Sequence, residues 1–390
     1  MISVQDALDQ LFALARPVTT ELCPLTEAAG RVLAAPIAAK LTQPPFAASS
    51  MDGYALNSVE ADLHAQFVVI GESAAGHGFE GRVGAGQAVR IFTGAPVPEG
   101  ADCVVIQEEV ERRGKLITLL TEDTTKSNIR PAGQDFGLGD EMSAPRRLTP
   151  SDIALAASMN HPELCVFKRP VVALVSTGDE LVQPGETPAE GQIIASNTYG
   201  LKALLEAHGA EARILPIARD NRASLETVFA LCDGADLIVT IGGASVGDHD
   251  IVADVAAGLG LQQSFYKVAM RPGKPLMAGQ MGAALMIGLP GNPVSALVCG
   301  HVFLLPVLRV MSGLTAAPAE RLTATLSAPL PANGPREHYM RATVTQGQIS
   351  AETRQDSALL SVLAAANALL IRPPHDGARA PGDTVEYISL

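Results

Sequence analysis

Hydrophobic residues in the first part of the chain recur over short distances, with one clear exception at the start. Residues 4–15 carry apolar residues at helical spacing, Ser3 is placed to cap them, and Asp6 stands three residues on, which predicts an opening helix. Between residues 67 and 140 the apolar runs are short and separated by glycines, so we expect a mostly β lobe there. A further helix is expected over residues 150–160.

The pattern changes at Arg169, where apolar strands begin to alternate with amphipathic helices. Such alternation is typical of a doubly wound α/β domain with a parallel sheet. The expected strands are residues 171–176, 212–218, 236–241 and 266–270, and a helix over residues 294–311 closes the domain. From residue 319 onward, alternating apolar and polar residues predict a small β-barrel or sandwich. The predicted fold class is therefore multidomain, α/β plus β.

Composition narrows the functional classes. A chain of 390 residues is long for a single core, so two to four domains are expected. The net charge of −13 argues against a nucleic-acid surface, but it permits a small anionic ligand wherever cations gather locally. The five cysteines lie far apart and form no CxxC pair, which favours reduced thiols in a cytoplasmic protein. The sequence shows no signal peptide and no obvious membrane span.

Ligands of doubly wound sheets bind at the carboxyl ends of the strands. Carboxylates follow the expected strands at Glu180, Asp220 and Asp250, and their oxygens could bind Mg²⁺. Each acid taken alone is more simply a helix cap or a solvated loop residue. Their common position at strand ends, beside a glycine-rich loop, favours a metal–phosphate site.

The glycine-rich loop over residues 242–247 lets the backbone approach an oxyanion, and a helix follows it. The loop matches neither GxGxxG nor GxxxxGK[ST], so it supports neither a dinucleotide site nor a P-loop. Lys267, Arg271 and Lys274 lie within eight residues and could neutralise a phosphate or a tetrahedral oxyanion. This interpretation is favoured over a solvated basic turn, because prolines and a glycine fix the backbone here in a chain that is otherwise acidic.

The segment GLPGNPVSAL, residues 288–297, places two prolines around Gly-Asn before a helix. Proline fixes φ, so this loop should be stiff and should hold Ser295 near the start of the helix. From composition alone, a purely structural turn is about as good an explanation.

Taken together, these motifs resemble the molybdopterin molybdenumtransferase family, of the MoeA and gephyrin E-domain type. The matching segments follow the family's order: PPFAASSMDGYA (44–55), FTGAPVPEGAD (92–102), RPAGQDF (130–136), STGDEL (176–181), IGGASVGDHD (241–250), RPGKPL (271–276) and GLPGNPVSA (288–296).

The resemblance implies four domains. They are a mixed domain I (residues 1–24 and 140–168, with part of 25–50), an elongated β-rich domain II (45–139), a MogA-like α/β domain III (169–318) and a β-barrel domain IV (319–390). It also implies a homodimer, with each active site between the α/β domain of one subunit and the β lobe of the other.

The candidate site residues combine the strand-end groups with those that the resemblance adds. The catalytic candidates are Asp52, Thr93, Asp135, Glu180, Asp220, Asp248, Asp250, Lys267, Arg271 and Lys274, of which Glu180, Asp220 and Asp250 are the metal candidates. The substrate-binding candidates are Thr177, Gly178, Gly242, Gly243, Ser245, Gly247, Pro290, Gly291, Asn292, Pro293, Ser295, Arg341 and Ser357. Arg271 stands where the family often has lysine, and the sequence around Ser357 departs from the family pattern.

The activity implied is Mg²⁺-dependent insertion of molybdate into adenylylated molybdopterin, with release of AMP. Two alternatives stay open at this point. One alternative is that this chain is itself the molybdopterin adenylyltransferase of the same pathway, and the other is that it is a non-enzymatic scaffold of the gephyrin type. If the chain is the molybdenumtransferase, the adenylyltransferase is a candidate partner protein. The sequence does not distinguish molybdate from tungstate.

Overall fold

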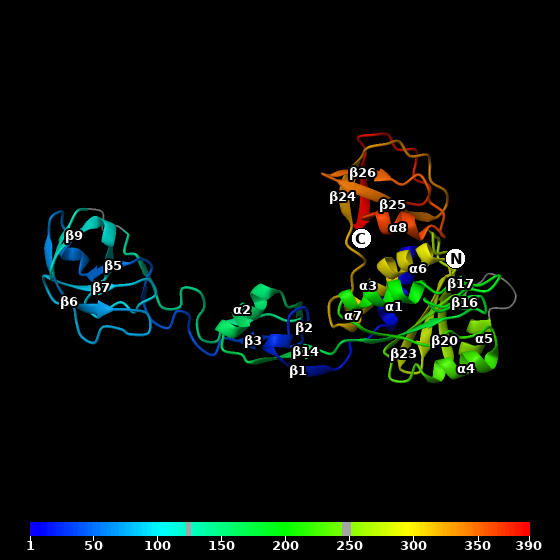
Figure 1. The fold of residues 1–390 in the computed structure, drawn as a ribbon, viewed down its shortest axis with the longest axis horizontal. Helices are drawn as coiled ribbons and strands as arrows, with labels where there is room; N and C mark the ends of the chain where they lie inside the picture. The colour runs from blue at the N-terminus through cyan, green and yellow to red at the C-terminus, as the bar shows by residue number, and fades with distance from the viewer. Residues whose placement is uncertain (122–125, 244–250) are drawn as a thin grey trace.

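The computed structural model describes residues 1–121, 126–243 and 251–390. The molecule is elongated, with a β lobe at one end, a small mixed domain in the middle, and an α/β domain with a β-barrel at the other end (Figure 1). The expected multidomain class, α/β plus β, is confirmed.

The mixed domain is a four-stranded sheet covered by one short helix. In the sheet the strand order is β1-β14-β2-β13. The helix α2 (Pro150–Ser158) begins where expected, because the Thr149 side chain accepts a hydrogen bond from the backbone of Asp152 and the Asp152 carboxylate accepts one from the backbone of Thr149. The elements are β1 (Thr20–Pro24), η1 (Leu25–Glu27), β2 (Val32–Leu33), β3 (Ile37–Ala38), β12 (Glu141–Met142), β13 (Arg146–Arg147) and β14 (Glu163–Phe167).

The β lobe is built on a six-stranded sheet with the order β8-β5-β7-β6-β10-β9. Its strands pack closely at Gly53, where an added Cβ would lie 2.1 Å from the carbonyl oxygen of Val105, so only glycine fits. The elements are β4 (Ala48–Ser49), β5 (Gly53–Leu56), η2 (Ser58–Glu60), β6 (Gln66–Ser73), β7 (Gln87–Ile91), β8 (Cys103–Ile106), η3 (Gln107–Glu109), β9 (Val110–Arg113), β10 (Leu116–Leu119) and β11 (Ile129–Arg130).

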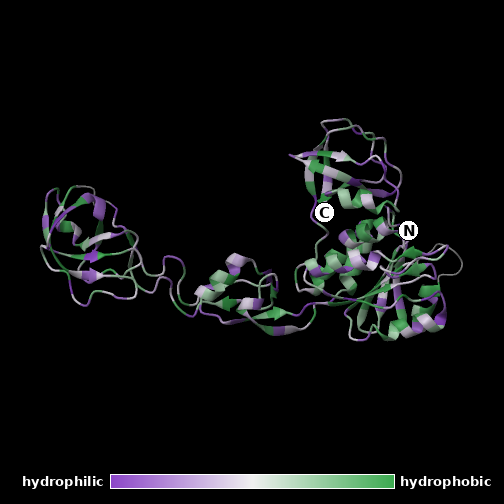
Figure 2. Cartoon of the chain, in the orientation of Figure 1, coloured by the Kyte–Doolittle hydropathy of each residue, from purple (hydrophilic) through white to green (hydrophobic). Residues whose placement is uncertain are grey.

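The α/β domain contains a six-stranded sheet in the order β18-β15-β19-β23-β22-β20, in which β18, β15, β19 and β23 are parallel. Its central strands are buried along almost their whole length and are largely apolar, because helices cover both faces. Figure 2 shows hydrophobic residues along these strands and the neighbouring helices. The elements are β15 (Val171–Ser176), β16 (Leu181–Val182), β17 (Ile193–Ile194), α3 (Asn197–Ala207), β18 (Glu211–Ile214), α4 (Arg222–Ala230), β19 (Leu237–Ile241), α5 (Ile251–Gly258), β20 (Leu261–Tyr266), β22 (Met277–Met281) and β23 (Ala284–Leu289).

Two expected strands differ from the structure. The strand predicted over 212–218 ends at Ile214, and only an isolated bridge follows it, between Thr177 and Ala218. The segment 266–270 is not a strand, because the backbone of Lys267 adopts a φ of 73° and the chain turns there. The residues beyond the turn form β21 (Met270–Arg271), which pairs with the barrel and not with the α/β sheet.

The expected helix over residues 294–311 is confirmed as one continuous helix. It consists of α6 (Pro293–Cys299), the π-helical turn η4 (Gly300–Leu304) and α7 (Leu305–Met311). With 19 residues and a mean hydropathy of 1.9, it is long and apolar enough to cross a membrane. However, 72% of that stretch is buried inside the protein, which identifies it as a core helix.

The last domain is a closed barrel, as predicted. The strand order is β21-β25-β26-β24-β28-β27, and the additional pairing of β25 with β27 closes the barrel. The elements are β24 (Leu322–Leu326), β25 (Glu337–Thr345), β26 (Gln348–Ala351), α8 (Leu360–Ala365), β27 (Ala368–Arg372) and β28 (Thr384–Ser389).

The opening helix α1 (Val4–Leu14) has the predicted Ser3–Asp6 capping box, but it packs in an unexpected place. The family resemblance implied that residues 1–24 belong to the mixed domain, whereas the apolar face of α1 joins the core of the α/β domain. The residue before this helix is also attached to the α/β domain, because the Ile2 backbone N–H donates a hydrogen bond to the Lys267 carbonyl. The first residues therefore contribute to the domain that holds the cavity described below.

We predict that Leu11→Ala destabilises the α/β domain, because Leu11 is 0% exposed in its core. The expected loss is about 2–5 kcal/mol of the free energy of unfolding, measured by urea denaturation. Hydrogen exchange should accelerate in β15 and β19. The matched control is Leu22→Ala, a 68% exposed position of the mixed domain, which should change stability by less than about 0.5 kcal/mol. Faster exchange confined to the mixed domain would contradict the packing of α1.

Candidate functional site

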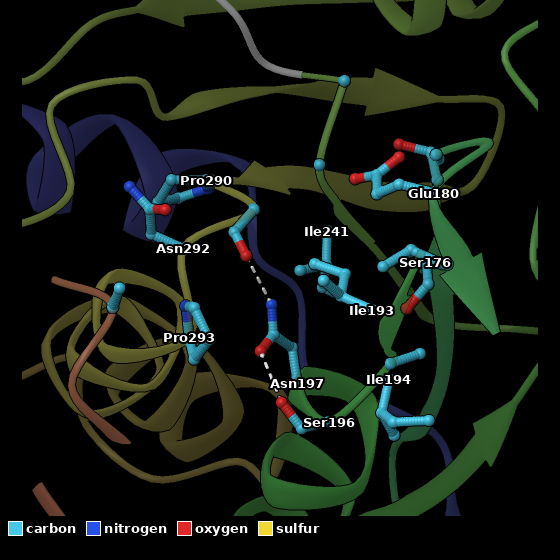
Figure 3. Close-up of a pocket in the computed structure, with 18 of the residues that line it drawn as sticks. Ser176, Glu180, Ile193, Ile194, Ser196, Asn197, Ile241, Pro290, Asn292 and Pro293 are labelled. Atoms are coloured by element: carbon cyan, nitrogen blue, oxygen red, sulfur yellow. Dashed lines mark hydrogen bonds between the residues drawn. The ribbon is translucent and has the colours of Figure 1, made fainter. Parts of the chain in front are cut away.

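A cavity of about 1050 Å³ lies at the carboxyl ends of the parallel strands. Figure 3 shows residues from several separate chain segments around it. The lining residues are Ser176, Thr177, Gly178, Glu180, Leu181, Ile193, Ile194, Ala195, Ser196, Asn197, Asp220, Ile241, Gly242, Gly243, Ile251, Pro275, Pro290, Gly291, Asn292, Pro293, Ala358 and Leu360. The structure therefore brings together ten of the predicted site residues: Thr177, Gly178, Glu180, Asp220, Gly242, Gly243, Pro290, Gly291, Asn292 and Pro293.

The glycines after β19 are required by close packing. An added Cβ at Gly243 would lie 2.2 Å from Val252, and one at Gly242 would lie 2.7 Å from the Thr177 carbonyl oxygen; both residues have positive φ. Gly242 donates its N–H to the Leu289 carbonyl, so it shapes the cavity and does not offer that donor to a ligand. The remaining predicted loop residues, Ser245, Gly247, Asp248 and Asp250, lie outside the described part of the chain.

Two of the three predicted metal-binding acids, Glu180 and Asp220, line this cavity. Their loops are fastened by Arg219, whose Nη1 donates to the carbonyls of Gly178 (3.4 Å), Asp179 (3.0 Å) and Leu181 (3.2 Å). The third acid, Asp250, is not among the described residues, and within the described ranges no group of three His, Cys, Asp or Glu side chains is arranged to hold a metal. Arg219 has a positioning role that the motif search did not assign.

The Pro-Gly-Asn-Pro loop forms the opposite wall of the cavity. Asn197 Nδ2 donates to the Gly291 carbonyl at 2.7 Å and so ties this loop to the start of α3 (Figure 3). Asn292 occupies the N-cap position of α6, but its side chain makes no capping hydrogen bond. That side chain is therefore available to a ligand in the cavity. Ser295 is buried inside α6 and does not line the cavity.

The barrel contributes a buried cation next to this wall. Arg341 on β25 is 0% exposed, and its Nη2 donates to the Asp356 carbonyl at 2.9 Å and to the Arg354 carbonyl at 3.3 Å. Its Nε and Nη1 atoms have no hydrogen-bond partner among the described residues. The segment that Arg341 holds continues to Ser357, whose carbonyl accepts from the Val294 backbone at 3.1 Å, and then reaches the cavity at Ala358.

The predicted cations Lys267, Arg271 and Lys274 flank the cavity but do not line it. They belong to the turn between β20 and β22, in which the Val268 backbone donates to the Lys274 carbonyl at 3.0 Å. The turn packs tightly on α6, because an added Cβ at Gly273 would lie 2.6 Å from the sulfur of Cys299. Within that turn, Pro275 reaches the cavity lining.

Arg271 adds positive charge at the seam between the α/β domain and the barrel. Burial and the neighbouring Arg271 charge lower the pKa of Arg341, while Asp356 opposes the shift. His338, which faces Arg271 in the β21–β25 register, has a pKa lowered to about 4, first by burial and then by nearby arginines. His338 Nε2 is buried without a partner among the described residues. The pattern search missed His338 because an alternating barrel strand gives no sign of which polar residue will be enclosed.

Asp52 and Thr93 form a compact unit in the β lobe. Asp52 Oδ1 accepts hydrogen bonds from the Thr93 backbone N–H and from the Thr93 hydroxyl, both at 2.8 Å. These two bonds, with Arg90 as a further favourable charge, hold the pKa of Asp52 below its usual value. Arg90 is stacked between the rings of Tyr54 (5.0 Å) and Phe92 (4.9 Å) and donates to the Gly53 carbonyl.

The β lobe is separated from the cavity within one chain. Figure 1 shows it at the far end of the molecule, beyond the mixed domain. Asp135 lies where the chain returns from this lobe, and its backbone donates to the Gln43 carbonyl at 3.1 Å. One subunit alone therefore does not bring Asp52, Thr93 and Asp135 to the cavity.

Comparison with known proteins identifies the family. Family models match three successive regions: the MoeA N-terminal region (domain I and II) over residues 2–160, a probable molybdopterin binding domain over 173–310, and the MoeA C-terminal region (domain IV) over 323–390. A molybdopterin molybdenumtransferase from Nostoc is 37% identical over 80% of this chain and 75% of its own length. The chain belongs to the MoeA family.

Two further members of the MoeA family match this chain over most of its length. A molybdopterin molybdenumtransferase from Haemophilus influenzae is 38% identical over 76% of this chain and 74% of its own length. The crystal structure of a molybdopterin biosynthesis MoeA protein from Pyrococcus horikoshii superposes with a TM-score of 0.87, covering all of both chains at 25% identity. The extended MoeA architecture is thus shared by a solved structure.

For this MoeA-family site we predict that Thr93→Val raises the pKa of Asp52. The substitution removes one of the two donors that favour the ionised carboxylate, while the backbone donor remains, so the rise should be partial. Because the native pKa is lowered, the stabilisation from this unit is present above the usual pKa and is lost as the pH falls through the native one. Carboxyl NMR titration measures the shift, with Thr118→Val in the same lobe as the control. An unchanged pKa in Thr93→Val would contradict the role of the hydroxyl.

Proposed function

We propose that this chain transfers molybdenum from molybdate to the dithiolene of adenylylated molybdopterin and releases AMP. The observation that supports this most directly is the position of the cavity. Two carboxylates lie on one wall, and the segment held by the incompletely paired guanidinium of Arg341 reaches the opposite one. This arrangement suits a ligand that carries a phosphate at one end and meets an oxyanion at the other.

The oxyanion end is assigned to the seam between the α/β domain and the barrel. A buried guanidinium with two nitrogen donors that have no partner in the described structure is costly, and a tetrahedral dianion would satisfy it. Arg271 and Lys274, on the turn beside Arg341, would add positive charge. Ser295 and Ser357 lie where the start of α6 is hydrogen-bonded to the barrel segment that Arg341 holds. We assign molybdate to this seam.

The phosphate end is assigned to the acidic wall. Glu180 and Asp220 share the cavity, and their oxygens fit the preference of Mg²⁺ for carboxylates, water and phosphate oxygens. Asp250 would complete the set that the sequence predicts. When bound, Mg²⁺ would neutralise charge on the phosphate oxygens. The two carboxylates would fix its place, while Asn292 and the adjacent backbone would orient the phosphate.

The reaction brings several anions together, so its barrier contains a large electrostatic part. The dithiolene sulfurs replace two oxygens of molybdate, which leave as water after taking up the thiol protons and two further protons. Hydrolysis of the phosphoanhydride consumes one water and releases AMP, leaving the phosphate on the pterin. Arg271, Lys274 and Arg341 lower the repulsion, and the rigid loops supply positioning. An acid among Asp220, Asp248 and Asp250 is the candidate for orienting the attacking water.

The active unit is proposed to be a cytoplasmic homodimer in which the β lobe of one subunit covers the cavity of the other. That arrangement would place Asp52, Thr93 and Asp135 opposite Glu180 and Asp220. The adenylylated substrate would come from the adenylyltransferase of the pathway. Efficient adenylylation of molybdopterin by this chain alone, from ATP and Mg²⁺, would favour the alternative activity. Normal pathway flux with the cavity variants below would favour a scaffold.

Molybdate-dependent AMP release from adenylylated molybdopterin measures the proposed activity. We predict that Glu180→Gln, Lys274→Ala and Asp52→Ala each lower the rate by about 10²–10³-fold, because each removes one charge from the site. The matched controls are Glu190→Gln and Lys126→Ala, two exposed positions outside the cavity lining, which should retain the full rate. Wild-type rates in all three site variants, with folding intact, would contradict the site.

A mixed dimer tests the split site. A heterodimer with Asp52→Ala in one subunit and Glu180→Gln in the other should retain about half of the wild-type activity, because one of its two composite sites is intact. Two differently tagged subunits, co-expressed and purified over both tags, provide this species. Homodimers of each variant are the controls. Activity no higher than that of the variant homodimers would show that the two residues do not act across the interface.

A further inference from the structure

A second cavity, of about 550 Å³, lies where the mixed domain, the α/β domain and the barrel meet. Its walls come from β13, the end of α3, the long core helix, the linker to the barrel and the last strand. The lining residues are Arg147, His208, His301, Leu305, Pro306, Leu308, Arg309, Leu314, Ala317, Pro318, Ala319, Glu320, Leu322, Ile388, Ser389 and Leu390. None of them belongs to the site described above.

Two arginines, Arg147 and Arg309, line this cavity, and neither forms an ion pair within the described part of the chain. Arg147 donates from Nη1 to the Gly30 carbonyl (2.8 Å) and from Nη2 to the His208 carbonyl (3.4 Å). Arg309 donates from Nε to the Thr315 carbonyl at 2.8 Å. All of these acceptors are neutral. The pKa of Arg147 is lowered by burial and then by the charge of Arg309, so the two guanidinium groups repel each other.

The two neighbouring histidines add no negative charge to the cavity, so Glu320 is the acidic side chain in its lining. His301 is half-buried, forms no hydrogen bond with any described residue, and has its pKa lowered to about 4, first by burial and then by His208. The ring nitrogen Nδ1 of His208 is hydrogen-bonded to the Leu204 carbonyl oxygen. Glu320 lines the same cavity but forms no ion pair with Arg147 or Arg309 in the described structure. Arg147 and Arg309 are both exposed residues, so a ligand can reach their guanidinium groups.

The remaining wall is largely apolar. Leu305, Leu308 and Leu314 line it together with Pro306 and Pro318. A cationic rim over an apolar wall suits a ligand that has a compact anionic group and a small hydrophobic or aromatic body. The volume admits a molecule of that size.

We propose that this cavity binds a phosphate monoester, whose dianion is held between Arg147 and Arg309 while its organic body lies on the leucine and proline wall. Guanidinium groups match phosphate geometry through paired N–H donors. His301 presents its ring to the same space and can donate a further hydrogen bond. Because Arg147 belongs to the mixed domain and Arg309 to the α/β domain, the ligand ties the two domains together. This site is independent of the proposed molybdenum transfer.

Isothermal titration of the full-length protein with phenyl phosphate tests the proposal. We expect saturable binding that weakens at least tenfold in Arg309→Gln and in Arg147→Gln, and that is retained in part by Arg309→Lys. The matched control is Arg112→Gln, an exposed arginine of the β lobe that also donates to a carbonyl. Glu180→Gln controls for binding in the larger cavity, and phenol and inorganic phosphate report the separate contributions of the body and the anion.

Binding that is lost in both cavity variants but kept in the Arg112 and Glu180 variants supports the site. Three results would overturn it: no saturable binding of phenyl phosphate, equal affinity in Arg309→Gln and the unaltered protein, or a change of affinity only in Glu180→Gln. Circular dichroism and the unfolding midpoint of each variant establish that it is folded. Because the experiment measures only the affinity for phenyl phosphate, its result does not depend on whether this chain transfers molybdenum.

Discussion

The register of three parallel strands is the constraint on which the rest of the site depends. Ser176, Ile241 and Leu289 are direct neighbours across β15, β19 and β23, so three chain segments leave the sheet at the same level. The acidic loop, the glycine loop and the Pro-Gly-Asn-Pro loop start from these positions and must therefore meet. A shift of one residue in any strand would turn its side chains to the other face and misplace the loop that follows. Continuous burial of the strands on both faces makes such a shift costly.

The seam between the α/β domain and the barrel depends on a second constraint, the turn after β20. Close packing of Gly273 on Cys299 fixes the turn against α6, and the β21–β25 pairing then places Arg271 beside the barrel strand that carries Arg341. The enclosed Arg341 has two donors without a partner among the described residues, which opposes folding because a buried donor without a partner loses its bonds to water. The backbone carbonyls of Arg354 and Asp356 compensate only in part. An oxyanion would recover the remainder, so the feature that costs stability is also the one that favours binding.

Much of this could be predicted from the sequence, for identifiable reasons. The apolar strands around Leu174 and Val239 and the helix capped by Thr149 follow from local patterns, and the gathering of Glu180, Asp220 and the glycines after β19 follows from the strand-end rule. The 290–293 loop was expected to be stiff, but its strand β23 was not predicted. The location of α1 could not be predicted, because an amphipathic face does not specify which core receives it. The strand expected over 266–270 was wrong because apolar composition does not reveal the reversal at Lys267. Similarly, the enclosure of His338 and Arg341 results from the closing of the barrel, which involves residues distant in sequence.

The elongated shape decides how the remaining candidates can act. The Asp52–Thr93 unit is a well-ordered arrangement, with a carboxylate kept ionised by two donors and a neighbouring arginine held between two rings. Such an arrangement is preorganised for contact with a ligand, yet the mixed domain keeps it away from the cavity of its own chain (Figure 1). The cavity, for its part, has its carboxylates and loops on the α/β domain. Two incomplete halves on one chain are complementary when two chains associate, because a two-fold axis supplies each half with the other's partner. In the proposed homodimer, the long arm would deliver the β lobe to a second subunit, and the mixed domain would set the distance over which it does so.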